Sequence, residues 1–176
     1  MNRNTRNFRN PVAHYAQSES GHLTRGLRNK NPFNIRRSNS KWLGKIPFDK
    51  SNDRSFEQFT LLQYGVRAGL YLLTKYVRDY GLGDVTQIVH RWAPAEDGNN
   101  EIAYVTAILS DVITSEVKRT KDYLYGMARA MCYVESRYVL TKDVFGRAFA
   151  CLPAPMCAYW MNLPTEGQTR EEVDGL

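Results

Sequence analysis

Glu135 has the surroundings that best suit acid catalysis in this sequence. Apolar residues recur at helical spacing from Leu124 to Tyr138, and Glu135 falls four residues after Met131, on or beside that apolar stripe. A carboxyl group that faces a core is costly to ionise, so we expect its pKa to rise and the group to stay protonated near neutral pH. Such a group can protonate the oxygen of a glycosidic bond. The alternative is that Glu135 lies at the edge of the stripe and pairs with Arg137 or another exposed base.

Three further glutamates compete for a chemical role. Glu101 belongs to the stretch RWAPAEDGNNE, where a carboxylate near a helix N-terminus is stabilised in its ionised form and suits charge stabilisation or water activation. It can equally be a favourable first-turn charge. Glu57 lies between Phe56 and Phe59 in an expected strand, from which it either reaches a groove or is simply solvated. Glu19 is a weaker competitor for the acid, because its polar neighbours offer no burial to raise a pKa.

The elements that would position these carboxylates are mainly α-helical. Residues 27–59 mix single aromatic and apolar residues with turn formers, which indicates a small, irregular β-hairpin lobe. From Tyr64 onward the apolar spacing becomes helical, and five helices are predicted. The first of these helices is expected to end at Gly81. The next three are expected to start at the N-caps Asp84, Asn99 or Asn100, and Thr120. The fifth is expected to start near Asp143 and to end at Pro153 and Pro155.

The 176 residues suffice for one domain with tails. We place a flexible basic arm at residues 1–25, the folded domain at residues 26–163 and an acidic tail at residues 164–176. Residues 1–50 hold eleven Lys or Arg against two acidic residues, a balance of +9, whereas the whole chain carries +6. The arm is therefore either a solvated tail, a nonspecific contact for nucleic acid, or an aid in approaching an anionic wall.

Composition disfavours several classes of protein. Charged residues interrupt every apolar run, so we expect no membrane insertion, and the N-terminus lacks the apolar segment of a secretory signal. The three histidines match no zinc-site spacing, and the odd number of cysteines argues against a disulfide framework. We expect neither a metal nor a cofactor.

Five blocks of sequence carry a resemblance to known proteins. They are RGLRNKNPFNIRRSNSKWLG at residues 25–44, FEQF at 56–59, YGVRAGLYLL at 64–73, RWAPAEDGNNEIAYV at 91–105 and AMCYVE at 130–135. In order and spacing they resemble a family of phage virion and prophage lysozyme-like proteins that includes a murein-degrading enzyme carried on a phage nucleocapsid. Separately, MARAMCYVESRY at residues 127–138 is similar to the acid helix of lytic transglycosylases. The resemblance implies a lysozyme-like helical domain with a small β-hairpin lobe, in which Glu135 is the acid.

The order of the elements departs from that of the usual lytic transglycosylase. There the acid helix precedes the hairpin lobe, whereas here the helix with Glu135 follows it. Either the fold is arranged in permuted order, or Glu19 or Glu57 is the acid.

The same blocks would supply one wall of a saccharide groove. Amide side chains both donate and accept hydrogen bonds, as glycan hydroxyls and N-acetyl groups require, and aromatic rings offer flat faces for sugars. The alternative is that the asparagines only make turns and that Trp42 and Phe33 only close the base of the hairpin. The candidate substrate-binding residues are Asn29, Asn31, Asn34, Trp42 and Tyr64.

These observations predict a phage-associated peptidoglycan hydrolase, a muramidase or lytic transglycosylase, that cleaves the glycan strand. It would come from a virion or an infected cell and act on the wall in the periplasm. Glu135 would donate a proton to the leaving oxygen and then remove one from the attacking hydroxyl, while Glu101 or Glu57 stabilises charge on the ring. The alternatives are a non-catalytic virion structural or assembly protein that binds other virion proteins or nucleic acid through its basic surface, and a protein that binds glycan without cleaving it.

Overall fold

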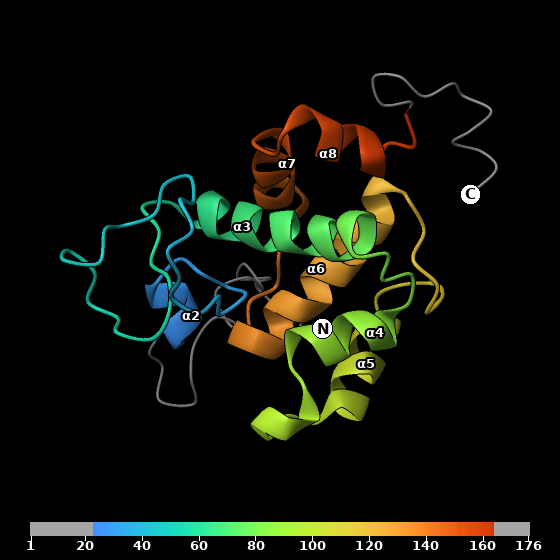
Figure 1. Ribbon diagram of the computed structural model, residues 1–176, viewed down its shortest axis with the longest axis horizontal. Coiled ribbons are helices and arrows are strands. Elements are labelled where there is room, and N and C mark those ends of the chain that lie inside the picture. Colours follow the sequence, from blue (N-terminus) through green and yellow to red (C-terminus); the bar gives the residue numbers. More distant parts are fainter. Residues whose placement is uncertain (1–22, 164–176) are drawn as a thin grey trace, which may run out of the picture.

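The computed structural model describes residues 23–163 (Figure 1). Glu19, the arm up to residue 22 and the tail at residues 164–176 lie outside that range. The described chain is mainly helical, as predicted. Its α-helices are α2 (Arg25–Arg28), α3 (Leu62–Thr74), α4 (Val85–Trp92), α5 (Glu101–Leu109), α6 (Lys121–Ser136), α7 (Lys142–Ala150) and α8 (Ala154–Trp160); a π-helix, η1 (Lys75–Asp79), continues α3, and a 3-10 turn, η2 (Ala95–Asp97), follows α4.

Helix α6 passes through the middle of the molecule (Figure 1). Its residues Leu124, Met127 and Met131 have no exposed surface. Helix α5 packs on α6 and on α4, while α3 packs on α7, so that α6 separates the α4–α5 pair from the α7–α8 pair. Burying this much apolar surface around one helix provides the main driving force for the fold.

The helix starts follow the N-cap signals in the sequence. The side chains of Asp84, Asn100 and Thr120 each accept a hydrogen bond from a backbone N–H in the first turn of α4, α5 and α6. Thr141 does the same for α7, which therefore begins one residue before the expected Asp143. Each cap satisfies a donor that has no partner within the helix.

Helices α2 and α8 were not expected from the sequence. Pro153, which we expected to end the fifth helix, is also the N-cap of α8, and Pro155 lies in the first turn of α8. Proline tolerates that position because the first N–H groups of a helix have no partner inside it. Pro153 thus lies between two helices, and Pro155 belongs to the second, where the sequence indicated a single helix end.

The described residues do not show the expected β-hairpin lobe. Residues 29–61 form loops without a named strand, joined by two isolated antiparallel bridges, Arg36 to Phe56 and Lys45 to Phe59. Side-chain hydrogen bonds to the backbone connect these loops, as backbone hydrogen bonds would connect paired strands. The amide of Asn31 donates to the carbonyls of Ile35 (3.0 Å) and Glu57 (2.9 Å) and accepts from the Ile35 N–H.

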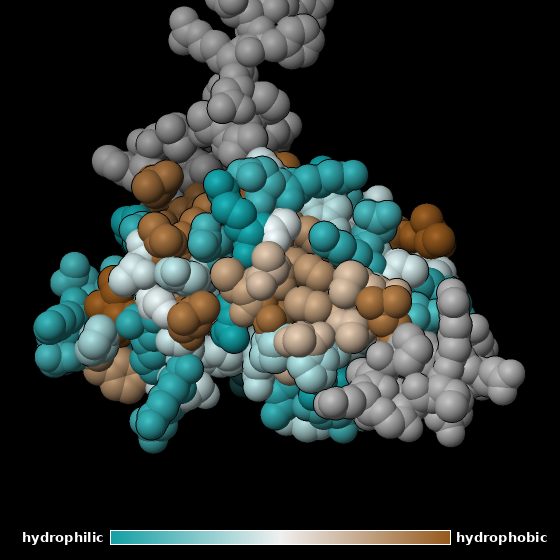
Figure 2. Space-filling view, turned by 90° about the horizontal axis from the view of Figure 1, so that it is seen from above, coloured by the Kyte–Doolittle hydropathy of each residue, from teal (hydrophilic) through white to brown (hydrophobic). Residues whose placement is uncertain are grey.

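The outer surface carries both polar and apolar residues. Seen from above, polar residues dominate the rim, and apolar residues gather in a central patch over α7 and α8 (Figure 2). Within residues 23–163, no helix is both long and apolar enough to cross a bilayer.

Candidate active site

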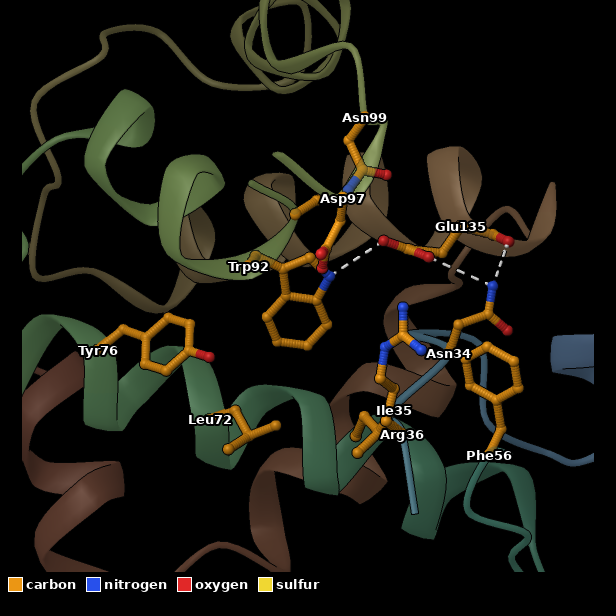
Figure 3. A pocket seen from close by; sticks show the side chains of 11 residues that line it. Asn34, Ile35, Arg36, Phe56, Leu72, Tyr76, Trp92, Asp97, Asn99 and Glu135 are labelled. Carbon is orange, nitrogen blue, oxygen red and sulfur yellow. Dashed lines mark hydrogen bonds between the residues drawn. The ribbon is translucent and has the colours of Figure 1, made fainter. Parts of the chain in front are cut away.

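A cleft of about 340 Å³ lies between the loop after α2, the end of α3, the α4–α5 connection and the end of α6 (Figure 3). Glu135 forms part of its wall, together with aromatic rings and polar side chains. The aromatic rings offer flat surfaces, and the amides, the guanidinium and the carboxylates offer donors and acceptors. The lining residues are Asn34, Ile35, Arg36, Phe56, Leu72, Tyr76, Trp92, Ala93, Asp97, Asn99 and Glu135.

Three side chains hold the half-buried Glu135 carboxyl in place. Its Oε1 accepts hydrogen bonds from Trp92 Nε1 (3.0 Å) and from the Tyr104 hydroxyl (2.9 Å). Its Oε2 accepts from Asn34 Nδ2 at the longer distance of 3.3 Å. Arg137, the expected alternative partner, lies over the Tyr133 ring (5.4 Å), and no ion pair within residues 23–163 involves Glu135. The carboxyl is therefore held by neutral donors and turned into the cleft.

The end of α6 is fixed by residues from the start of the described chain. Asn34 Nδ2 also donates to the main-chain carbonyl of Glu135 (2.7 Å), and Thr24 Oγ1 donates to that of Ser136 (2.8 Å). These carbonyls have no partners within the helix, so both bonds complete its C-terminus. Gly26 allows the approach, because a Cβ atom there would come within 1.9 Å of Ser136 Oγ.

Trp92 and Tyr104 reach Glu135 from α4 and α5. The Trp92 indole is oriented by edge contacts with Phe33 (5.7 Å) and Tyr76 (6.2 Å). Burial raises the pKa of Tyr104 well above its ordinary value, and the Glu135 carboxylate adds to the shift. Tyr104 therefore keeps its proton at neutral pH and acts as a hydrogen-bond donor.

Tyr76 forms the opposite wall of the cleft from within the π-helix η1. Its ring stacks on Tyr80 (5.9 Å, 27°), and the Arg91 guanidinium lies over both rings at 5.6 and 5.1 Å. Burial raises the pKa of Tyr76. Single π-turns within helices occur frequently at functional sites, and here the π-turn contributes an aromatic wall.

Glu101 does not line this cleft. Its Oε1 accepts from the Ala95 N–H (2.6 Å) and contacts His90 Nδ1 (3.0 Å), and these two hydrogen bonds lower its pKa. Glu101 thereby fixes the start of η2, whose last residue, Asp97, does line the cleft. Possible metal-ligand atoms of His90, Glu96 and Glu101 lie within 4.8 Å of one another on the surface.

Glu57 lies away from the cleft in a buried ion pair. Only 1% of its surface is exposed, and its Oε1 accepts from Lys45 Nζ (2.9 Å) and from the N–H and hydroxyl of Ser38. Strand alternation predicted a solvated or groove-facing side chain here. Because residues 29–61 form irregular loops, that alternation does not hold. The Glu57 carboxylate instead accepts hydrogen bonds inside the loop region.

The candidate asparagines separate into one at the cleft and two that hold the loops. Asn34 lines the cleft with φ of 47°, a left-handed conformation that asparagine tolerates. Asn31 is fully buried, and its side-chain amide is hydrogen-bonded to the loop backbone. Asn29 donates to Asp53 Oδ2 (2.6 Å), and the neighbouring Arg25 guanidinium holds the pKa of Asp53 well below its usual range.

The two candidate aromatic residues lie outside the cleft. The Tyr64 ring packs over Gly44, where a Cβ atom would come within 2.0 Å of it. The Trp42 ring contacts Tyr71 edge-on (5.7 Å) and lines a neighbouring hollow. Tyr64 therefore packs against a turn of the loop region, whereas Trp42 lies at a surface depression.

Several cleft residues were not assigned to the site from the sequence. Asp97 belongs to the acidic cluster of the RWAPAEDGNNE block, and Asn99 in the same block is predicted only as a helix N-cap. Trp92 shows only the spacing of an apolar position in the helix after Asp84. Arg36 and Phe56 lie in the blocks at residues 25–44 and 56–59, but nothing local indicates that they meet, because only the bridge between their loops brings them together.

No protein-family model matches the chain. Over 80 residues it is 40% identical to "Protein P5" of Pseudoalteromonas phage PM2, a match that covers 44% of this chain and 49% of that protein. The match therefore spans about half the length of this phage protein.

Proposed function

We propose that the chain cleaves the glycan strand of bacterial peptidoglycan, as a phage-associated lysozyme-like glycosidase or lytic transglycosylase. The observation that carries the proposal is the Glu135 carboxyl, half-buried at the wall of an aromatic-sided cleft and held by three neutral donors. General acid catalysis requires a carboxyl group with a fixed direction toward the reacting oxygen. The similarity to a phage protein supports the phage setting. The virion or infected cell as source and the periplasmic wall as the place of action are part of the proposal.

The donors around Glu135 determine which oxygen carries the proton. Trp92 and Tyr104 both donate to Oε1, so Oε1 is an acceptor and the acid form of Glu135 would carry its proton on Oε2. The Asn34 amide must turn its Nδ2 toward α6, because the main-chain carbonyl of Glu135 can only accept. Oε2 has the single, longer contact and is therefore the oxygen able to protonate a substrate.

The proton transfer balances without a cofactor. Oε2–H gives its proton to the bridging glycosidic oxygen as the bond from that oxygen to the anomeric carbon breaks. The sugar ring then carries positive charge, and a hydroxyl, from water or from the substrate, forms the new bond to the anomeric carbon. Its proton returns to Glu135, which regains its starting state. Asp97, on the same cleft, is placed to stabilise the charged ring, whereas Glu101 acts through η2 as a positioning residue.

Release of soluble fragments from purified peptidoglycan sacculi tests the proposal. We expect the wild-type chain to release fragments and Glu135→Gln to lose at least about a hundredfold in rate, since one general acid contributes roughly 10²- to 10⁴-fold. The matched control is Glu116→Gln, a side chain that is 72% exposed and pairs only with Lys118 across the surface. It should keep the wild-type rate.

Glu57→Gln and Asp97→Asn separate the remaining carboxylates. Asp97→Asn should lower the rate with unchanged stability, whereas Glu57→Gln should act through stability, because it removes the buried carboxylate that pairs with Lys45. Full activity of Glu135→Gln would remove Glu135 from the mechanism. A folded wild-type chain that releases no fragments would favour the alternative of a non-catalytic virion protein.

A further inference from the structure

A second hollow continues the cleft along α3. It measures about 580 Å³ and shares Leu72 and Tyr76 with the cleft of Glu135. Trp42, Tyr71 and Tyr80 add further aromatic surface. We name it the basic hollow. Its full lining is Ser40, Lys41, Trp42, Arg67, Tyr71, Leu72, Lys75, Tyr76, Tyr80 and Pro153.

The charges of the two hollows differ. The lining of the basic hollow includes Lys41, Arg67 and Lys75 and no acidic residue, whereas the first cleft contains two acidic residues, Asp97 and Glu135, beside one basic residue, Arg36. A polymer that follows the shared wall would therefore meet the acid at one end and cations at the other. Low-dielectric walls strengthen the attraction of such cations for an anion, so the basic hollow favours a negatively charged group.

The three cations are available to a ligand to different degrees. Arg67 lines the hollow, and its Nε donates to the Cys151 carbonyl (2.7 Å), which fixes the guanidinium. Lys75 Nζ lies 5.7 Å from the Tyr80 ring centre. Lys41 is exposed, and neither lysine forms an ion pair in the described part of the chain. The planar guanidinium of Arg67 and the two flexible ammonium groups of Lys41 and Lys75 are suited to bind carboxylates.

We propose that the basic hollow binds the carboxylate-bearing branches of the glycan whose backbone lies in the cleft of Glu135. This inference rests on the proposed function, because the shared wall at Tyr76 is what makes the branch and the cleaved bond parts of one substrate. Peptidoglycan presents carboxylates at two places, on the lactyl group of the muramic sugar once it is free of peptide, and along the peptide branch. Aromatic and basic residues also suit single-stranded nucleic acid, but continuity with the acid cleft favours the glycan.

Equilibrium binding to three soluble probes tests the proposal. The probes are a neutral N-acetylglucosamine oligomer, a peptide-free muramyl oligosaccharide and a peptide-bearing muramyl oligosaccharide. The protein is the full chain with Glu135→Gln, so that no probe is cleaved. In that background, Lys41→Gln with Lys75→Gln should weaken binding of a carboxylate-bearing probe about tenfold at low salt, leave the neutral oligomer unchanged, and show less effect at 1 M salt. Lys118→Gln, a surface lysine outside both hollows, is the matched control.

The probes also distinguish the two sources of carboxylate. Weaker binding of the peptide-free muramyl probe alone assigns the lactyl group, and weaker binding of the peptide-bearing probe alone assigns the peptide branch. Weaker binding of both charged probes means that the basic hollow accepts either carboxylate. Equal loss for the neutral oligomer, no loss for either charged probe, or a single-stranded oligonucleotide that competes more tightly through the same lysines would overturn the inference. Because binding is measured without turnover, wild-type chain that fails to cleave sacculi refutes the proposed function while leaving the binding result readable.

Discussion

The hydroxyl of Tyr104 offers a sharp test of how Glu135 is held. Tyr104 is 6% exposed, and its hydroxyl donates to Glu135 Oε1 at 2.9 Å. Tyr104→Phe removes that donor and keeps the ring packing between α5 and α6. Trp92 Nε1 remains on the same oxygen, so the carboxyl keeps one of its two short bonds.

The expected magnitude follows from the loss of one hydrogen bond. A net hydrogen bond contributes about 1 kcal/mol to stability, so Tyr104→Phe should lower the free energy of unfolding by about 1 kcal/mol. The rate of fragment release should also fall about tenfold, because the carboxyl gains rotational freedom.

A double-mutant cycle, read from urea unfolding, separates this bond from ordinary packing. Combining Tyr104→Phe with Glu135→Ala should give a coupling energy of about 1 kcal/mol, since alanine removes the acceptor of the hydrogen bond. The matched control is Tyr125→Phe, whose hydroxyl donates to the Leu140 carbonyl at 3.0 Å. That control should cost about 1 kcal/mol and show no coupling to Glu135 beyond about 0.5 kcal/mol. Additive effects of Tyr104→Phe and Glu135→Ala would refute the reasoning.

Two further measurements address packing and charge. A Cβ atom on Gly126 of α6 would come within 2.6 Å of the Asp111 carbonyl oxygen, so Gly126→Ala should lower the free energy of unfolding by about 1–3 kcal/mol. Gly146→Ala in α7, where a Cβ atom meets nothing within 4 Å, should raise it by about 0.5–1 kcal/mol, and denaturant melts that reverse this order would contradict the packing. Arg25 holds the pKa of Asp53 below its unfolded value, so the stabilisation is complete above the unfolded pKa of about 4 and is lost as pH falls toward the lower folded pKa. Asp53→Asn should therefore be less stable at neutral pH and lose less stability on acidification, and equal acid sensitivity of both chains would contradict this assignment.

Local signals predicted the helices well because a helix start depends on a few neighbouring residues. Asp84 and Thr120 cap helices where their spacing to the apolar stripe indicated. The contact between Asn34 and Glu135 joins residues 101 positions apart, and no local pattern encodes such a pair. Glu57 illustrates the opposite case, since period-two alternation predicts a face only where a regular strand forms, and residues 29–61 form loops.

The winding of η1 makes the two hollows depend on a single residue. An α-helix advances about 100° for each residue, and a π-turn accommodates one residue more than an α-turn. A chain one residue shorter between Tyr76 and Tyr80 would regain regular α pitch, and Tyr80 would then stand three residues after Tyr76, about 300° around the helix axis. The present stack of the two rings under Arg91 would lose its spacing while the helix itself persisted. The length of the chain at this point is therefore as important to the two hollows as the identity of any side chain that lines them.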